Sequence, residues 1–215
     1  MEKNISNFDG LHFDEVKIKN GDIELLNISA KIKPGEVLTL MGASGSGKSS
    51  LINAICGFLP KGFSCTGTIS LDGRDISDLP VEKRRLGVLF QDPLLFPHLN
   101  VEENILFAMQ QGGSTLEREK KVLELLKAVD MNNYQKRDVA TLSGGQQARI
   151  SLIRVLATDP KALLLDEPFS KLDVNLRQNV AQLVFEIVKE RKLPTLLVTH
   201  DALDAKAARG AIISL

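Results

Sequence analysis

The sequence has no tryptophan and only one tyrosine, Tyr134, so its core must be built mainly from aliphatic side chains. It also lacks an excess of charge of either sign, because 27 lysines and arginines balance 27 aspartates and glutamates. Proteins that bind nucleic acid over a broad surface usually carry a basic excess, so we expect no nucleic-acid partner. A net charge of zero still allows a local site for phosphate groups.

Long apolar runs are missing as well. No stretch approaches the roughly 20 consecutive apolar residues that a membrane-spanning helix needs. The N-terminal segment 1–10 lacks the apolar core of a signal peptide. The two cysteines, Cys56 and Cys65, fit neither a metal-ligand spacing nor a disulfide framework. These absences predict a cytosolic protein with reduced thiols.

The patterns that are present predict an α/β fold with a mostly parallel sheet. Residues 11–18 alternate with a change of phase, which predicts a bulged strand, and residues 26–32 alternate cleanly. Continuous aliphatic runs separated by helical patterns are typical of parallel strands that are covered on both faces. The predicted buried strands are 37–41, 86–90, 162–165, 196–199 and 211–215.

The helical patterns complete this prediction. Residues 175–192 carry apolar side chains at helical spacing. Residues 116–129 follow Ser114 and Glu117, which have capping-box spacing, and we expect Leu116, Leu123 and Leu126 to share one face. Residues 93–141 show helical patterns and no good strand. We therefore expect a single domain over 1–215, with an N-terminal antiparallel β region and a helical subdomain inserted at 93–141.

Residues 42–49 match the phosphate-loop pattern G-x-x-x-x-G-K-[ST] between a predicted strand and an apolar helix. Glycines let the backbone N–H groups wrap around phosphate oxygens, and the following helix presents its positive end to them. Lys48 is predicted to reach the β- and γ-phosphates, and the Ser49 hydroxyl to bind Mg²⁺. The motif alone leaves kinases, GTPases, motors and transport ATPases open. The predicted nucleotide-binding residues are Gly42, Ala43, Ser44, Gly45, Ser46, Gly47, Lys48, Ser49 and Ser50.

The apolar run 162–165 ends in two carboxylates, Asp166 and Glu167. The carboxyl end of a parallel strand lies at the edge of the sheet where ligands bind. Asp166 is therefore predicted to hold Mg²⁺, and Glu167 to orient and deprotonate the attacking water. Adjacent carboxylates at a strand end are often solvated turn residues, but the phosphate loop upstream favours the catalytic interpretation.

The pentapeptide Leu142-Ser143-Gly144-Gly145-Gln146 is the most specific feature. With it, the sequence resembles the ATP-binding subunits of ABC transporters over nearly its whole length. The resemblance identifies residues 42–49 as the Walker A motif, 165–167 as the Walker B region and 142–146 as the signature. Segments 63–66, 87–92 and 162–174 are also similar to a bacterial subgroup, the YnjD-type ATPases.

The resemblance implies roles for three further residues. Gln91 corresponds to the Q-loop glutamine, which binds Mg²⁺ and links the γ-phosphate to the helical insert. His200 corresponds to the switch histidine at the γ-phosphate, although a histidine at a strand end is often only a surface residue. Asp173, in the D-loop 170–173, communicates across a dimer, and it can also cap the following helix.

A dimer is also implied by the resemblance. Ser143 and Gln146 have capping-box spacing, so the signature should open a second helix whose N-terminus can bind phosphate. The long stretch between Lys48 and Ser143 argues against one chain closing both sites around one nucleotide. In the family, two subunits pair head to tail. Each ATP then lies between Walker A of one subunit and the signature of the other, here Ser143, Gly144, Gly145 and Gln146.

Two departures from the family pattern are visible. Segment 17–21 lacks the aromatic residue that usually stacks on adenine, and Ile18 or Asn20 is expected near the base. Lys171 replaces the usual small residue of the D-loop.

Segment 92–99 is similar to importer-type ATPases, and its apolar, proline-containing sequence predicts a groove for a coupling helix of a permease, with Phe96 and Leu99 as contacts.

The sequence thus predicts the ATP-hydrolysing subunit of an importer-type ABC transporter, with ATP and Mg²⁺ as cofactors. We expect a homodimer held peripherally at the cytoplasmic face of the inner membrane by integral membrane permease subunits, with a solute-binding protein as a further candidate partner. Only 15 residues follow His200, so no regulatory C-terminal β domain is expected. The alternatives are an exporter, a mechanotransmission complex and a nucleic-acid-associated ABC ATPase.

Overall fold

Two β-sheets form the framework of the chain, whose computed structural model describes residues 8–43 and 45–215. The antiparallel sheet has the order β2-β1-β4-β5 and the parallel sheet the order β6-β7-β8-β3-β9. Both predicted sheets are therefore confirmed. The strands are β1 (Leu11–Asn20), β2 (Ile23–Ile32), β3 (Val37–Met41), β4 (Phe63–Leu71), β5 (Arg74–Asp75), β6 (Leu86–Leu89), β7 (Ala162–Asp166), β8 (Thr195–Thr199) and β9 (Ala211–Ser214).

The parallel sheet separates two hydrophobic cores, because its aliphatic residues alternate between its faces. Leu163 and Leu165 of β7 enter one core, which the helices α2 to α5 cover, whereas Leu164 enters the other, beneath α1 and the antiparallel sheet. All three leucines are fully buried. The predicted bulge in β1 is also present, as a register shift between Phe13 and Val16.

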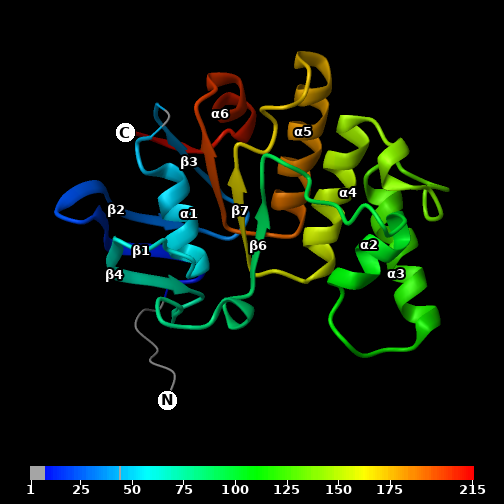
Figure 1. Cartoon of the computed structure of the whole chain (residues 1–215), viewed down its shortest axis with the longest axis horizontal. Helices are drawn as coiled ribbons and strands as arrows, with labels where there is room; N and C mark the ends of the chain where they lie inside the picture. The colour runs from blue at the N-terminus through cyan, green and yellow to red at the C-terminus, as the bar shows by residue number, and fades with distance from the viewer. Residues whose placement is uncertain (1–7, 44) are drawn as a thin grey trace.

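The helices are α1 (Lys48–Cys56), α2 (Val101–Ala108), α3 (Thr115–Ala128), α4 (Gly144–Ala157), α5 (Val174–Glu190) and α6 (Ala202–Ala208), with 3₁₀ turns η1 (Val81–Lys83) and η2 (Val139–Thr141). In Figure 1, α2 and α3 lie at the end of the molecule opposite to β1, β2 and β4. The capping box predicted at Ser114 and Glu117 is present.

One predicted helix face is wrong. In α3, Leu116 and Leu123 are exposed, with 75% and 48% of their surface accessible, and only Leu126 of the three is buried. The face that packs into the core instead carries Val122 and Leu125 together with Leu126. Successive residues of a helix are turned by 100°, so Leu116 and Leu123 project from a different side of α3 than the buried residues. The spacing of leucines in the sequence therefore predicted the wrong side as the buried face.

A buried asparagine fixes the segment that enters the insert. The side-chain amide of Asn104 on α2 is fully buried; its Nδ2 donates to the carbonyls of Phe96, Leu99 and Asn100, and its Oδ1 accepts from the Phe96 N–H. These contacts satisfy backbone groups of the loop that leads into α2. The conformation of segment 96–100 is therefore set by α2.

The last strand ends beside the phosphate loop. The Leu215 N–H donates to the Met41 carbonyl at 2.8 Å, and a Cβ on Gly42 would lie 3.1 Å from the Leu215 Cβ.

Among the described residues, no helix is long and apolar enough to cross a membrane. Cys56 is buried, Cys65 is exposed, and both are free thiols, as predicted.

Candidate functional site

The phosphate loop connects β3 to α1 and has the conformation that its glycines allow. Gly45 and Gly47 both have φ of 87°, in the left-handed region that residues with a Cβ rarely adopt. Gly47 is the N-cap of α1. Ser44 was also predicted to bind nucleotide, and it lies outside the described residues. Ser49 and Ser50 lie in the first turn of α1.

The Lys48 side chain folds back over its own loop. Its Nζ donates to the carbonyls of Gly42 at 2.7 Å and Ala43 at 2.6 Å, and to Ser46 Oγ at 3.3 Å. Only 5% of Lys48 is exposed. These contacts hold a positive charge at the mouth of the loop, where backbone N–H groups and the N-terminus of α1 also favour anions. The loop therefore fits the phosphates of a nucleotide.

Asp166 lies at the end of β7, within reach of the first turn of α1. Ser49 Oγ donates to Asp166 Oδ1 at 3.5 Å. Burial and the neighbouring Glu167 carboxylate raise the pKa of Asp166, although Ser49 and Lys48 act in the opposite direction. A hydroxyl and a carboxylate are the hard oxygen ligands that Mg²⁺ takes together with substrate phosphates. The pair thus fits Mg²⁺, and no cluster of three or more His, Cys, Asp or Glu side chains for a metal occurs among the described residues.

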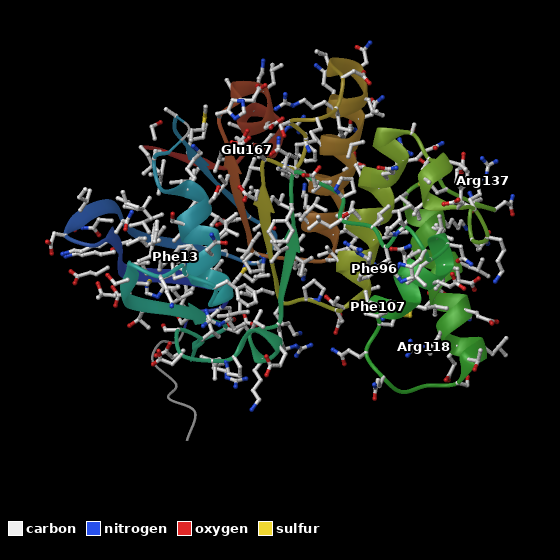
Figure 2. The ribbon with its side chains drawn as sticks, viewed as in Figure 1. Phe13, Phe96, Phe107, Arg118, Arg137 and Glu167 are labelled. Atoms are coloured by element: carbon white, nitrogen blue, oxygen red, sulfur yellow. The ribbon has the colours of Figure 1, made fainter. Side chains whose placement is uncertain are left out.

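Glu167 and His200 meet at the same edge of the sheet. His200 Nδ1 lies 3.0 Å from Glu167 Oε1. The backbone positions both residues: the Glu167 N–H donates to the Val198 carbonyl, and the Glu167 carbonyl accepts from Ser170 Oγ. Figure 2 shows Glu167 beyond the arrowheads of β6 and β7. Asp166, Glu167 and His200 therefore lie together, as their places after parallel strands predicted.

Gln91 follows β6 by two residues and lines a cavity of about 180 Å³. The same cavity is lined by Gly144 of the signature and by Lys171 and Leu172 of the D-loop. Its walls thus come from three predicted motifs. Lys171 also forms an ion pair with Asp92, which joins the D-loop to the residue after Gln91.

The signature opens helix α4 as predicted. Ser143 is the N-cap, and its side chain and that of Gln146 form a capping box with each other's backbone N–H groups. Gln146 Nε2 also donates to the Tyr134 hydroxyl at 3.0 Å. Gly145 packs against α5, because a Cβ there would lie 2.5 Å from Leu176 Cδ2. Figure 1 shows α1 and α4 on opposite sides of β6 and β7.

Asp173 caps α5, because its Oδ1 accepts the Leu176 N–H at 3.1 Å. Of the two residues expected near the base, Ile18 is fully buried in the core and has no surface for it, whereas Asn20 is exposed at the end of β1. The β2 residue that lies against the loop is Leu25, whose Cβ would be 3.3 Å from a Cβ on Gly47. Sequence reasoning missed Leu25 because its exposure depends on which face of β2 meets the loop.

Sequence reasoning also missed Arg177. This arginine of α5 forms ion pairs with Asp201 and Asp204, on either side of the start of α6. An arginine on an amphipathic helix normally points to solvent, so no sequence signal distinguished it.

The model of the ABC transporter family matches residues 25–170. The chain belongs to the ABC transporter family. This confirms the predicted resemblance: the chain has the fold of an ABC cassette, and it is an ATP-binding subunit and an ATPase of this family.

Two curated relatives illustrate the range of similar proteins. This ABC cassette is 44% identical over 183 residues to the uncharacterized ABC transporter ATP-binding protein YnjD of Escherichia coli strain K12. The alignment covers 85% of this chain and 84% of YnjD. It is 41% identical over 194 residues to the sulfate/thiosulfate import ATP-binding protein CysA of Bacillus cereus. That match covers 88% of this chain but only 54% of CysA, so the cassette spans about half of that relative.

Solved structures agree with this assignment. The cassette superposes on the dimeric structure of MJ0796, described as a bacterial ABC transporter cassette, with a TM-score of 0.77, 32% identity and coverage of 95% and 94% of the two chains. A post-hydrolysis state of MJ0796 bound to ADP and Pi gives a TM-score of 0.76 at the same identity and coverage.

Proposed function

We propose that this cassette drives an importer-type ABC transporter, in which ATP binding and hydrolysis by a homodimer are coupled to solute transport through separate permease subunits. The observation that carries the hydrolytic part of the proposal is the set of contacts from Ser49 to Asp166 and from Glu167 to His200 at one edge of the parallel sheet. The name of the CysA relative, an import ATP-binding protein, supports import as the direction of transport.

In this proposal each side chain has a defined task. Lys48 holds the β- and γ-phosphates, and Ser49, Asp166 and Gln91 hold Mg²⁺. Glu167 orients and deprotonates the attacking water, and His200 donates a hydrogen bond to the γ-phosphate while its contact with Glu167 keeps the two groups aligned. When bound, Mg²⁺ neutralises charge that develops on the phosphate oxygens.

We also propose that the second half of each nucleotide site comes from the partner copy. The N-termini of α1 and α4 both suit phosphate, yet the two helices lie on opposite sides of β6 and β7 (Figure 1). A head-to-tail pair brings Ser143, Gly144, Gly145 and Gln146 of one copy to Lys48 of the other, with Asp173 near the same interface. The dimeric structure of the similar MJ0796 cassette supports the formation of a dimer.

We treat the insert 93–141 as the helical subdomain. The proposed docking site for a permease helix is the part of its surface formed by Leu94, Phe96 and Phe107. Leu94 and Phe107 expose 58% and 70% of their surfaces, and the rings of Phe96 and Phe107 meet edge to face at 4.8 Å. The labels in Figure 2 show these two phenylalanines together beside α2. Such a partner would hold the cassette peripherally at the cytoplasmic face of the inner membrane.

The central test is Glu167→Gln. We expect ATP hydrolysis to fall about 100-fold or more, because the amide cannot accept the proton of the water. ATP binding should persist and should drive dimer formation in size-exclusion chromatography. Glu190→Gln, at the exposed end of α5, makes the same chemical change outside the site and should hydrolyse ATP at the wild-type rate.

Turnover of Glu167→Gln at the wild-type rate would refute the assigned role of Glu167. Dimer formation is tested separately by Lys48→Ala, which should bind ATP poorly and stay monomeric. Direction is tested by identifying the membrane protein that co-purifies with the wild-type cassette. A permease that works with a solute-binding protein supports import, whereas a membrane protein with one large extracytoplasmic loop favours mechanotransmission.

A further inference from the structure

The residues on both sides of His200 are anchored, whereas the histidine ring is largely exposed. Thr199 Oγ1 donates to Asp204 Oδ2 at 2.9 Å and accepts the Asp201 N–H at 3.1 Å. Thr199 and Asp204 are almost completely buried, with 1% and 2% of their surface accessible. The His200 side chain is 54% exposed and contacts the Glu167 carboxylate. The place of the ring is therefore set mainly by its two neighbours in the chain.

One guanidinium group holds this segment. Arg177 Nε and Nη2 donate to the two oxygens of Asp204 at 2.7 and 2.6 Å, and Arg177 Nη1 lies 2.8 Å from Asp201 Oδ2. The planar guanidinium thus bridges two carboxylates with three of its nitrogens, which a lysine ammonium cannot reproduce. Through Asp204 and Thr199 it reaches the strand side of His200, and through Asp201 it reaches the helix side.

The same arginine is tied to the D-loop. The Arg177 N–H donates to the Asp173 carbonyl at 2.8 Å, within the helical turn that the Asp173 side chain caps. Helix α5 packs against α6, which begins after Asp201. Arg177 therefore connects Asp173, which it contacts through its main chain, to the segment that carries His200, which it contacts through its guanidinium.

We propose that Arg177 is a positioning residue that sets the place of the His200 ring opposite Glu167 and links it to the D-loop. The inference rests on the proposed roles of His200 and Glu167. Arg177 itself lies behind the segment, since its side chain is only 14% exposed and its nitrogens are engaged with Asp201 and Asp204. It acts on the reaction through His200.

The test uses Arg177→Lys in the full chain, because lysine keeps a positive charge opposite the buried Asp204 carboxylate. We expect kcat for ATP hydrolysis to fall about 10- to 100-fold, the effect of misplacing a reacting group by about 1 Å. The Kd for ATP should change less than about twofold. Arg191→Lys, at the C-cap of the same helix, is the matched control and should behave as wild type.

A double-mutant cycle with His200→Ala distinguishes positioning from a general structural effect. If Arg177 acts through His200, Arg177→Lys should not slow the His200→Ala variant further in single-turnover hydrolysis. An equal fold-loss in both backgrounds would overturn the inference. So would a lower melting temperature with unchanged kcat.

Asp201→Asn provides a second route if Arg177→Lys folds poorly. Asparagine keeps the N-cap of α6 and removes only the ion pair, so this variant should also lose kcat while keeping its melting temperature. Wild-type turnover of His200→Ala would refute the proposed role of His200, and the inference with it. Slow His200→Ala with fast Arg177→Lys and fast Asp201→Asn would refute the positioning role alone.

Discussion

Glu167 has a left-handed backbone conformation, with φ of 46°. A residue with a Cβ pays roughly 1 kcal/mol or more for this conformation. The turn is held by the Val198 carbonyl and the Ser170 hydroxyl, which accept from and donate to the Glu167 backbone. Because these contacts use only main-chain atoms of residue 167, Glu167→Gln leaves them in place and tests the carboxylate alone.

Cys56 provides a prediction on pH and stability. Burial raises the pKa of its thiol from 9.0 to about 11. Between about pH 9 and pH 11 the unfolded chain binds fewer protons at this site than the folded one, so the free energy of unfolding falls as pH rises. We expect a loss of about 2 to 3 kcal/mol over this range, measured by urea unfolding.

The Cys56→Ala variant isolates this effect, because other groups also titrate at alkaline pH. Its free energy of unfolding should decline less steeply than that of the wild type between pH 9 and pH 11. Cys65→Ala removes the exposed thiol and serves as the comparison. Parallel pH dependences of the wild type and Cys56→Ala would contradict the prediction.

At the scale of elements, the far end of α1 is held by a buried arginine. The Arg84 guanidinium donates to the carbonyls of Ala54 and Ile55 in the last turn of the helix, and to those of Ser77 and Leu79 in the chain leading to β6. A cation at a helix C-terminus also interacts favourably with the helix dipole. Helix α1 follows the phosphate loop and begins at Lys48. By holding the C-terminal end of this helix, Arg84 stabilises the position of the helix that carries the loop.

Arg84→Met should therefore destabilise the cassette by about 2 to 4 kcal/mol, because buried carbonyl groups lose their donors. The measurement is the midpoint of urea unfolding. Arg85→Met is the adjacent control. Its guanidinium is half exposed and, among the described residues, is paired with Asp159 at 3.4 Å, so its loss should cost about 0.5 kcal/mol or less. Equal shifts for the two variants would contradict the assigned role.

The elements differ in how well the sequence predicted them. Strands with continuous aliphatic runs, such as β7 and β8, were predicted because burial on both faces leaves a direct mark on composition. Strand β4 was missed, since most of its first half is exposed and carries small polar residues. The order of the parallel strands was also beyond prediction, because it depends on pairings between segments far apart in the chain.

Within the site, motifs predicted the groups that we propose face the nucleotide, whereas the other residues of the site became visible only from tertiary contacts. Lys48, Ser49 and Asp166 were found because their chemistry demands fixed residue types at fixed spacings. Leu25 and Arg177 were not found, since a leucine on a strand and an arginine on a helix have many roles. Their partners become known only when the elements are packed together.

At the scale of the whole molecule, the proposed docking surface leads to a prediction about assembly through its exposed residue Phe107. Phe107→Ala should weaken capture of the permease by about tenfold, the effect typical of losing an aromatic anchor at an interface. The measurement is the amount of membrane protein that co-purifies from detergent extracts. Phe107→Ala should bind ATP as the wild type does.

Leu116→Ala is the matched control, because Leu116 is 75% exposed on α3 and lies outside the proposed docking surface. It should capture the permease as well as the wild type does. Equal capture by Phe107→Ala and the wild type would place the permease contact elsewhere on the cassette.

The position of Leu215 has a practical consequence for anyone who labels or fuses this protein. Its main chain is hydrogen-bonded to the residue before the phosphate loop, and its side chain lies against Gly42. A purification tag or fusion partner joined after Leu215 would lie next to the phosphate loop, and we expect it to compete for space with a nucleotide bound at the proposed site. By the same proximity, we expect a small fluorophore at Leu215, the residue after strand β9, to report nucleotide binding at the proposed site.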